Sequence, residues 1–194
     1  SRRQRQMCIR DSPISTQQSG FVFVAQMRAN LPDAVGGVLW FGTDDANMTV
    51  FTPVYCCTTK APVCYTRVDG ADYITFSWNS AFWIFNWVAN MVYPRYDLMI
   101  GDVRATQNEL ETTFNEAQEG IEAAAVKLYE KNPETAVKFL TNYTDMTAQS
   151  TFDTWKRLGE FIIVKYNDGV IRKMKDGKFE RNAIGQPAGV VRPG

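Results

Sequence analysis

Two neighbouring carboxylates follow an apolar segment of the chain and could take part in binding or catalysis. Asp44 and Asp45 come directly after VLWFGT, which reads as a short strand. Paired carboxylates at a strand end can bind an ammonium group or act as acid and base. Asp is also common in solvated turns, so a simple turn is the alternative interpretation of this pair. DDAN lacks the alternating oxygen ligands and the glycine of a calcium loop.

The segment SWNSAFW, residues 77–83, is the second candidate for chemistry. Trp78, Asn79 and Ser80 are predicted to lie in the first turn of a helix that Ser77 caps. The N–H groups of such a turn, together with an Asn amide, can hold a carboxylate or an oxyanion. Helix capping combined with aromatic core packing is the alternative interpretation.

Cysteine and histidine counts limit the possible mechanisms. The chain has no histidine, which excludes Ser-His-Asp and Cys-His catalysis and His-ligated metal sites within these residues. An enzyme would instead need carboxylates, a lysine or an N-terminal amine as its base, and no cofactor is expected. The thiols of CCTTKAPVC do not follow a recurring zinc spacing. They are expected to be small buried residues, with a disulfide from Cys64 to Cys56 or Cys57 as the alternative.

Composition indicates one ordinary globular domain. The chain has 194 residues, with 21 basic and 21 acidic side chains, so its net charge favours neither nucleic acid nor an anionic membrane as a partner. The most apolar stretch, residues 74–93, is interrupted by serine and asparagine and is rich in tryptophan. It predicts a buried aromatic helix and no membrane span.

The first twelve residues differ from the rest of the chain. Residues 1–12, SRRQRQMCIRDS, have neither helical nor strand periodicity and resemble a translated sequencing adapter. We interpret them as a non-native leader; a natural basic arm is the alternative. Residues 13–76 predict an antiparallel β segment. Its strands are expected at 21–28, 38–43 and 48–56.

Two of these strands carry further information. The strand at 38–43 is continuously apolar, which is typical of a strand covered on both faces. Pro53 lies in the third strand, and because proline cannot donate a hydrogen bond to a neighbouring strand, that strand is expected at an edge or a bulge.

Helices are predicted for residues 77–166. The aromatic helix, apolar on nearly all faces, is expected to be buried between other layers and to end at Pro94. A stripe of apolar residues predicts a second helix at 108–131, which Asn132 and Pro133 separate from the next one. A shorter helix and then a further helix are expected up to residue 166, so that the long helices form an antiparallel hairpin. Residues 167–194 are predicted to be a polar tail with turns at 167–169 and 175–177, and its last stretch, 183–194, is expected to be loose.

Long segments of the chain resemble one known family. Residues 15–56, 76–96 and 142–169 are similar to the C-terminal part of bacterial dipeptidases of the dipeptidase A type, which are cysteine-type N-terminal-nucleophile hydrolases. The resemblance covers about residues 13–180 in order.

The resemblance implies an α+β fold, namely the C-terminal part of a four-layer αββα sandwich with a long helical hairpin. It implies hydrolysis of dipeptides by an N-terminal cysteine, exposed by processing, whose own amino group is the base. Neither a metal nor a cofactor is implied, and the full-length enzyme is expected to be a homo-oligomer. Members of the family occur both inside cells and exported, which leaves the compartment open.

Cys8 does not match the nucleophile of this family. The family's nucleophile lies hundreds of residues before the GGVLWFG region, whereas Cys8 lies only about thirty residues before it. We therefore interpret Cys8 as a decoy, expect the nucleophile upstream of this chain, and carry over no catalytic residue. The segments GTDDAN and SWNSAFW match the family and give the candidate substrate-binding residues, with Asp44 or Asp45 for the ammonium end of a dipeptide. These candidates are Asp44, Asp45, Trp78, Asn79 and Ser80.

Two alternatives to a dipeptidase remain. One is another N-terminal-nucleophile hydrolase, an amidase of the penicillin or bile-salt acylase kind. The other is a non-catalytic binding module built on the helical hairpin and the aromatic helix.

Overall fold

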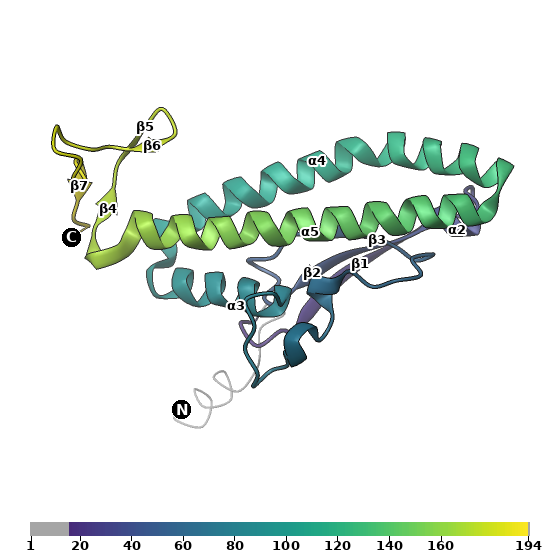
Figure 1. Cartoon of the computed structure of the whole chain (residues 1–194), viewed down its shortest axis with the longest axis horizontal. Helices are drawn as coiled ribbons and strands as arrows, with labels where there is room; N and C mark the ends of the chain where they lie inside the picture. Colours follow the sequence, from purple (N-terminus) through teal and green to yellow (C-terminus); the bar gives the residue numbers. More distant parts are fainter. Residues whose placement is uncertain (1–15, 194) are drawn as a thin grey trace, which may run out of the picture.

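The computed structural model describes residues 16–193. Two long helices, α4 (Tyr96–Lys131) and α5 (Pro133–Tyr166), run side by side along the longest dimension of the molecule (Figure 1). The three-stranded sheet and the shorter helix α3 (Ala81–Val92) lie along one side of α5, and four short strands form the C-terminal end (Figure 1). Helix and sheet belong to one structure, which confirms the α+β class.

The sheet is antiparallel, as predicted, with the order β1-β2-β3. Its strands are β1 (Phe21–Met27), β2 (Gly37–Thr43) and β3 (Thr52–Tyr55), and one helical turn, α2 (Asp33–Gly36), joins the first two. Pro53 pairs with Trp40 and lies in an edge strand, as expected.

β3 is shorter than the strand predicted at 48–56, because the residues before it bond to α4 instead of to a strand. Gln107 donates to the carbonyl of Thr49, and the N–H of Phe51 donates to Glu111 over 3.0 Å. A helix thus provides part of the hydrogen bonding that a neighbouring strand would supply.

The two faces of the sheet have different surroundings. Trp40 and Tyr55 lie on the face that meets the helices, where their polar atoms bond to Gln26 and to Glu122 of α4. On the opposite face, Tyr65 covers only the Phe41 end of β2. The expectation that residues 38–43 are covered on both faces is therefore met only in part within residues 16–193.

α3 begins later than predicted. The N–H of Ser80 bonds back to the carbonyl of Ser77, so that residues 77–80 form a turn and the first helical residue is Ala81. α3 ends at Val92, before the 3-10 turn η3 (Tyr93–Arg95), as Pro94 predicted. Its buried face stacks on α5, with the rings of Phe85 and Trp155 4.6 Å apart.

The hairpin of α4 and α5 confirms the predicted pairing of long helices. Asn132 ends α4 and caps α5, because its side-chain oxygen accepts from the N–H of Glu134 over 2.9 Å, and Pro133 takes the first helical position. α4 starts at Tyr96 and not at residue 108. Two helices were predicted for residues 134–166, whereas α5 is continuous.

Threonine side chains explain why α5 does not break. Thr144 accepts from the backbone N–H of Tyr55, and the hydroxyl of Thr52 donates to Thr151, each over 3.3 Å. The segment that interrupts the apolar pattern of α5 therefore covers β3 with small polar groups. It is a contact surface and not a helix boundary.

The C-terminal tail has more structure than predicted. β4 and β7 pair, and β5 and β6 form a hairpin whose turn residues, Asp176 and Gly177, both have positive φ. Such a turn favours Asp-Gly, which confirms the turn predicted at 175–177. The expectation that residues 183–194 are loose is wrong for Val190 and Val191, which pair with β4. The elements are η4 (Asn167–Gly169), β4 (Ile171–Arg172), β5 (Met174–Lys175), β6 (Lys178–Phe179) and β7 (Val190–Val191).

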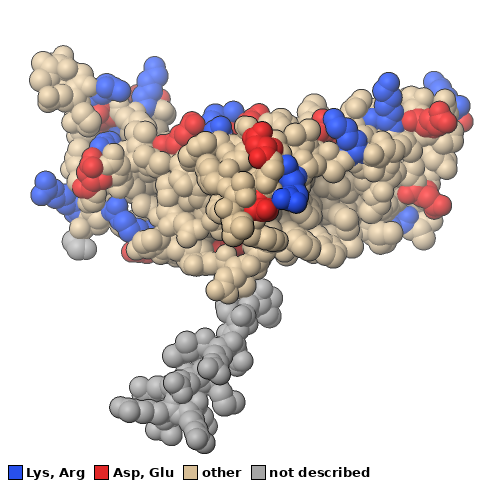
Figure 2. Space-filling view, turned by 60° about the horizontal axis from the view of Figure 1, so that its bottom comes forward, with Lys and Arg blue, Asp and Glu red and all other residues tan. Residues whose placement is uncertain are grey.

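Charges of both signs are interspersed on the face shown in Figure 2, with broad uncharged areas between them. No helix among the described residues has the length and apolarity needed to cross a bilayer. The predicted leader, residues 1–12, lies outside the described residues and stays a prediction.

Candidate functional site

A pocket of about 410 Å³ lies where the segment between β3 and α3 folds over one end of the sheet. Its volume is within the range of about 300–1,000 Å³ found for small-molecule sites. The segment contributes two 3-10 turns, η1 (Val63–Tyr65) and η2 (Val68–Gly70). The pocket is lined by Gly20, Phe21, Phe41, Thr43, Cys64, Tyr65, Thr66, Arg67, Ala71, Asp72, Tyr73, Ser80 and Phe82.

Aromatic rings form much of the pocket wall. Phe21 of β1 stacks on Phe41 of β2 with ring centroids 6.0 Å apart, and Phe41 in turn meets Tyr65 at 5.1 Å. Tyr73 and Phe82 pack edge to face at 5.2 Å. Burial raises the pKa of Tyr65, so its ring stays an uncharged wall. The pocket is therefore suited to an apolar group.

One ion pair supplies charge to this pocket. Arg67 Nη2 lies 3.1 Å from Asp72 Oδ2, and the Arg67 side chain is 76% exposed. Asp72 also accepts from the N–H of Ile74 over 3.1 Å. That backbone bond, with smaller contributions from Thr75 and Arg67, holds the pKa of Asp72 below its ordinary value. Asp72 is therefore an anion at neutral pH.

Of the three residues predicted at the start of the aromatic helix, Ser80 lines the pocket, whereas Trp78 and Asn79 do not. Ser80 is the N-cap of α3, but its side chain makes no capping hydrogen bond. The Asn79 amide donates to Asp69 over 2.8 Å, and the hydroxyl of Ser77 donates to the same carboxylate oxygen over 2.7 Å. The Asn79 amide thus stabilises the turn before α3.

Trp78 belongs to an aromatic cluster beside the pocket. It packs edge-on against Phe76 at 4.8 Å and against Trp87 of α3 at 5.1 Å. Half of the Trp78 side chain remains exposed. The second face of α3 is thus lined by aromatic side chains that are themselves partly exposed, so this helix is not covered all round by the described residues.

Asp44 and Asp45 lie in a turn after β2, as predicted, but the turn is buried. The two residues are only 2% and 0% exposed, so the interpretation as a solvated turn is wrong. Asn86 of α3 donates to Asp44 Oδ1 over 3.1 Å, and Tyr93 donates to Asp45 Oδ2. The N–H of Asn47 donates to Asp45 Oδ1 over 3.0 Å.

Asp44 lies beside the pocket but is not one of the residues that line it. Its N–H donates to the carbonyl of Gly20 over 3.0 Å, and Thr43 precedes it; both of these neighbours line the pocket. Burial raises the pKa of Asp44 to about 6. The backbone of Asp44 therefore lies next to the pocket wall, whereas its carboxyl group bonds to Asn86 of α3 and has its charged form disfavoured.

The described cysteines are free thiols: Cys56 is exposed, Cys57 is half-buried and Cys64 is buried. The disulfide alternative is therefore not formed in this structure, and the expectation that the cysteines are buried is confirmed for Cys64 and wrong for Cys56. Cys64 lines the pocket, but burial raises the pKa of its thiol to about 12. A buried, protonated thiol is a poor nucleophile. Cys8 lies outside the described residues.

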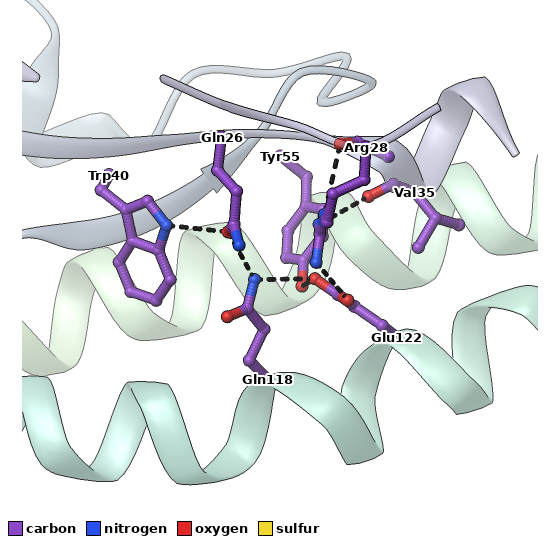
Figure 3. A network of polar contacts seen from close by, with 8 residues as sticks. Gln26, Arg28, Val35, Trp40, Tyr55, Gln118 and Glu122 are labelled. Atoms are coloured by element: carbon purple, nitrogen blue, oxygen red, sulfur yellow. Dashed lines mark hydrogen bonds and ion pairs between the residues drawn. The ribbon is translucent and has the colours of Figure 1, made fainter. Parts of the chain in front are cut away.

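A polar network behind the sheet was not predicted (Figure 3). The carboxylate of Glu122 on α4 accepts from Arg28, from the hydroxyl of Tyr55 and from Gln118, over 2.5, 3.1 and 2.9 Å respectively. Gln118 also donates to Gln26 over 2.8 Å. This network joins the strands to α4.

The residues of α4 that bond to the sheet region recur at helical spacing. Gln107, Glu111, Gln118 and Glu122 are separated by four, seven and four residues and so share one face of α4. This spacing of polar residues can be seen in the sequence. However, this face is made of polar residues, whereas the usual sequence signal for the buried side of a helix is a stripe of apolar residues.

The pocket residues between β3 and α3 were also missed. Arg67, Asp72 and Tyr73 lie in a segment without periodicity, which contacts β2 through Tyr65 on Phe41 and α3 through Tyr73 on Phe82. Long irregular segments in compact domains are often functional. The length of this segment and its mixture of aromatic and polar residues could therefore have indicated a binding site. Within residues 16–193, no group of three or more His, Cys, Asp or Glu side chains is placed to hold a metal ion.

Comparison with known proteins gives one family. The model described as Peptidase family C69 matches residues 1–109, more than half of the 194 residues. No curated protein matches the chain. The matched residues contain the sheet, both predicted candidate segments and the whole wall of the pocket.

Proposed function

Since the chain belongs to peptidase family C69, a family of dipeptidases, we propose that it is part of a cysteine dipeptidase. Family membership implies peptidase activity. The finer proposal is that an N-terminal cysteine, supplied by polypeptide upstream of these residues, is the nucleophile. The family match over residues 1–109 supports the dipeptidase assignment. The proposal of an upstream nucleophile rests on the resemblance and on the mismatch of Cys8 described above.

The exposed face of the sheet supports a sandwich with further layers. Phe21, Phe23 and Met27 alternate along β1 and point away from the helices, with 59%, 52% and 73% of their surface exposed. Apolar side chains gathered on one face usually mark a contact surface. In a four-layer αββα arrangement, a second sheet would cover this face at Phe23 and Met27 and leave the pocket at the Phe21 end open to a ligand, while α4 and α5 cover the other face.

The proposed reaction uses the thiolate of the upstream cysteine, with its own amino group as base. The amino group takes the proton of the thiol, and the thiolate attacks the peptide carbonyl carbon. The same group returns the proton to the peptide nitrogen as the C–N bond breaks, which leaves a thioester and releases the C-terminal amino acid. Water then hydrolyses the thioester and releases the N-terminal amino acid. Cys64, with its raised pKa, is unsuited to this role.

The role of Asp44 or Asp45 in binding the ammonium end of a dipeptide remains a proposal. Asn86 and Tyr93 already bond to these carboxyl groups. An ammonium group would therefore have to displace one of these partners or share a carboxyl oxygen with it. Oligomerisation of the full-length enzyme is likewise proposed.

Expression of the reading frame extended upstream tests the proposed function. We expect the mature extended protein to begin with cysteine and to hydrolyse dipeptides faster than penicillin or bile-salt amides. Light scattering should report a mass above that of one chain. An extended frame without a processed cysteine, or a start codon at Met7, would favour a binding module. Preference for the bulky amides would instead assign the protein to the acylase kind.

A further inference from the structure

The pocket at the end of the sheet has chemistry suited to one part of a dipeptide. Its apolar walls come from three separate parts of the chain, namely the two strands, η1 with the residues that follow it, and α3. Phe21 and Tyr65 are linked through Phe41, and Tyr73 meets Phe82 edge to face. A ring entering this space can make stacked and edge-on contacts of the same kind as those between the wall residues.

Arg67 gives the pocket a cationic group that is accessible to a ligand. Within residues 16–193, its guanidinium bonds only to Asp72, through one N–H of Nη2, which leaves the second N–H of Nη2 and the N–H groups of Nε and Nη1 for another acceptor. Arginine binds carboxylates through two parallel hydrogen bonds. Because the Arg67 side chain is 76% exposed, an incoming carboxylate can reach it without unfolding the pocket.

We infer that this pocket binds the C-terminal residue of a dipeptide, with an aromatic or bulky apolar side chain between the rings and the terminal carboxylate on Arg67. The inference rests on the proposed function, which it extends from dipeptides in general to one class of them. The hydroxyl groups of Thr43, Thr66 and Ser80, which also line the pocket, provide hydrogen-bonding partners for the backbone of such a ligand.

Binding to the 194-residue chain tests the inference without any need for hydrolysis. Calorimetric titration should give phenylalanylphenylalanine a Kd at least about tenfold lower than that of glycylglycine, because burying an aromatic side chain stabilises a complex by more than about 1.4 kcal/mol. Arg67→Gln should weaken binding of phenylalanylphenylalanine by about tenfold. The same substitution should leave binding of its C-terminal amide unchanged.

Two variants test the apolar wall. Phe82→Ala should raise the Kd of phenylalanylphenylalanine by about tenfold. Thr66→Phe, at an exposed lining residue, should block binding by filling the pocket. Circular dichroism checks that each variant folds. If Phe82→Ala does not fold, the binding measured for Thr66→Phe tests the apolar wall instead. Met146→Ala, on an exposed part of α5, is the control and should bind as the parent chain does.

Equal affinity for the two dipeptides, no measurable binding of phenylalanylphenylalanine, or equal effects of Arg67→Gln on acid and amide would overturn the inference. These binding measurements can fail independently of the hydrolysis measurements that test the proposed function. Selective binding without hydrolysis by the extended protein would remove only the dipeptidase proposal. Hydrolysis that is indifferent to Phe82 and Arg67 would remove only the pocket assignment.

Discussion

The carboxylate of Glu122 lies 2.5 Å from the guanidinium of Arg28, and this contact joins α4 to the end of β1 across 94 residues of sequence (Figure 3). Both side chains are largely buried, at 10% and 20% exposure. Removing one charge of such a pair leaves the other without compensation. The pair therefore holds the sheet, and with it the pocket, in place on the hairpin.

Glu122→Gln should lower the free energy of unfolding by about 2–3 kcal/mol, because Arg28 loses its carboxylate in a largely buried position. Urea denaturation measures this change. Asp168→Asn is the matched control: it removes an i,i+4 pair with Arg172 in which the Asp168 side chain is 74% exposed. It should lower the free energy of unfolding by less than about 0.5 kcal/mol. Equal effects of the two substitutions would show that the buried pair contributes no more than a surface one.

Two glycine-to-alanine substitutions in the long helices should have opposite effects. A Cβ on Gly159 of α5 would lie 2.3 Å from the indole ring of Trp87, so Gly159→Ala should separate α3 from α5 and cost about 1–3 kcal/mol. Gly101 of α4 has open space around its Cβ position. Gly101→Ala should therefore stabilise the chain by about 0.5–1 kcal/mol through helix propensity. Thermal unfolding of both variants checks the prediction, which fails if Gly159→Ala is neutral or stabilising.

Asp44 should make stability fall as pH rises from about 4 to about 6. Burial raises the pKa of Asp44 from 3.8 to about 6, so between these values the folded chain holds a proton that the unfolded chain has released. The penalty present above pH 6 is about 3 kcal/mol at most. Asp44→Asn removes this penalty and keeps an oxygen that can accept from Asn86.

Denaturation at several pH values checks this. Asp44→Asn should match the parent chain near pH 4 and exceed it in stability by about 2–3 kcal/mol at pH 7.5. Asp176→Asn is the control, because Asp176 also has a positive φ but is exposed. A constant difference across the pH range would show that backbone preference, and not titration of Asp44, causes the effect.

The thiols should react in the order of their exposure. In a Cys8→Ala background, Cys56 should be modified first and Cys64 only on unfolding, since burial raises the pKa of Cys64 to about 12. The time course of reaction with a chromogenic disulfide reagent measures this order. Fast native modification of Cys64, or a disulfide from Cys64 to Cys56 or Cys57, would contradict the structure.

Local signals in the sequence predicted much of the fold. β-branched and aromatic runs located the strands, Pro53 indicated an edge, and Asn132 with Pro133 located the turn of the hairpin, because each depends on local backbone chemistry. The continuity of α5 could not be predicted in the same way. Thr144 and Thr151 look like an interruption of an apolar stripe, and only their bonds to β3 show that this polar surface is buried.

The candidate site was predicted less well. The strand-end position of Asp44 and Asp45 follows from local pattern, but their burial depends on Asn86 and Tyr93, which lie 42 and 48 residues further along the chain. Of the predicted binding residues, Ser80 lines the pocket. Arg67 and Asp72 reach it through an irregular segment whose path is set by tertiary contacts.

Dipeptide hydrolysis by the purified 194-residue chain, compared with its Cys8→Ala variant, tests the central proposal most directly. Because the proposed nucleophile lies upstream of these residues, we expect no hydrolysis above background by either protein. Saturable hydrolysis by the parent chain that Cys8→Ala abolishes would contradict it, and would make Cys8 the nucleophile.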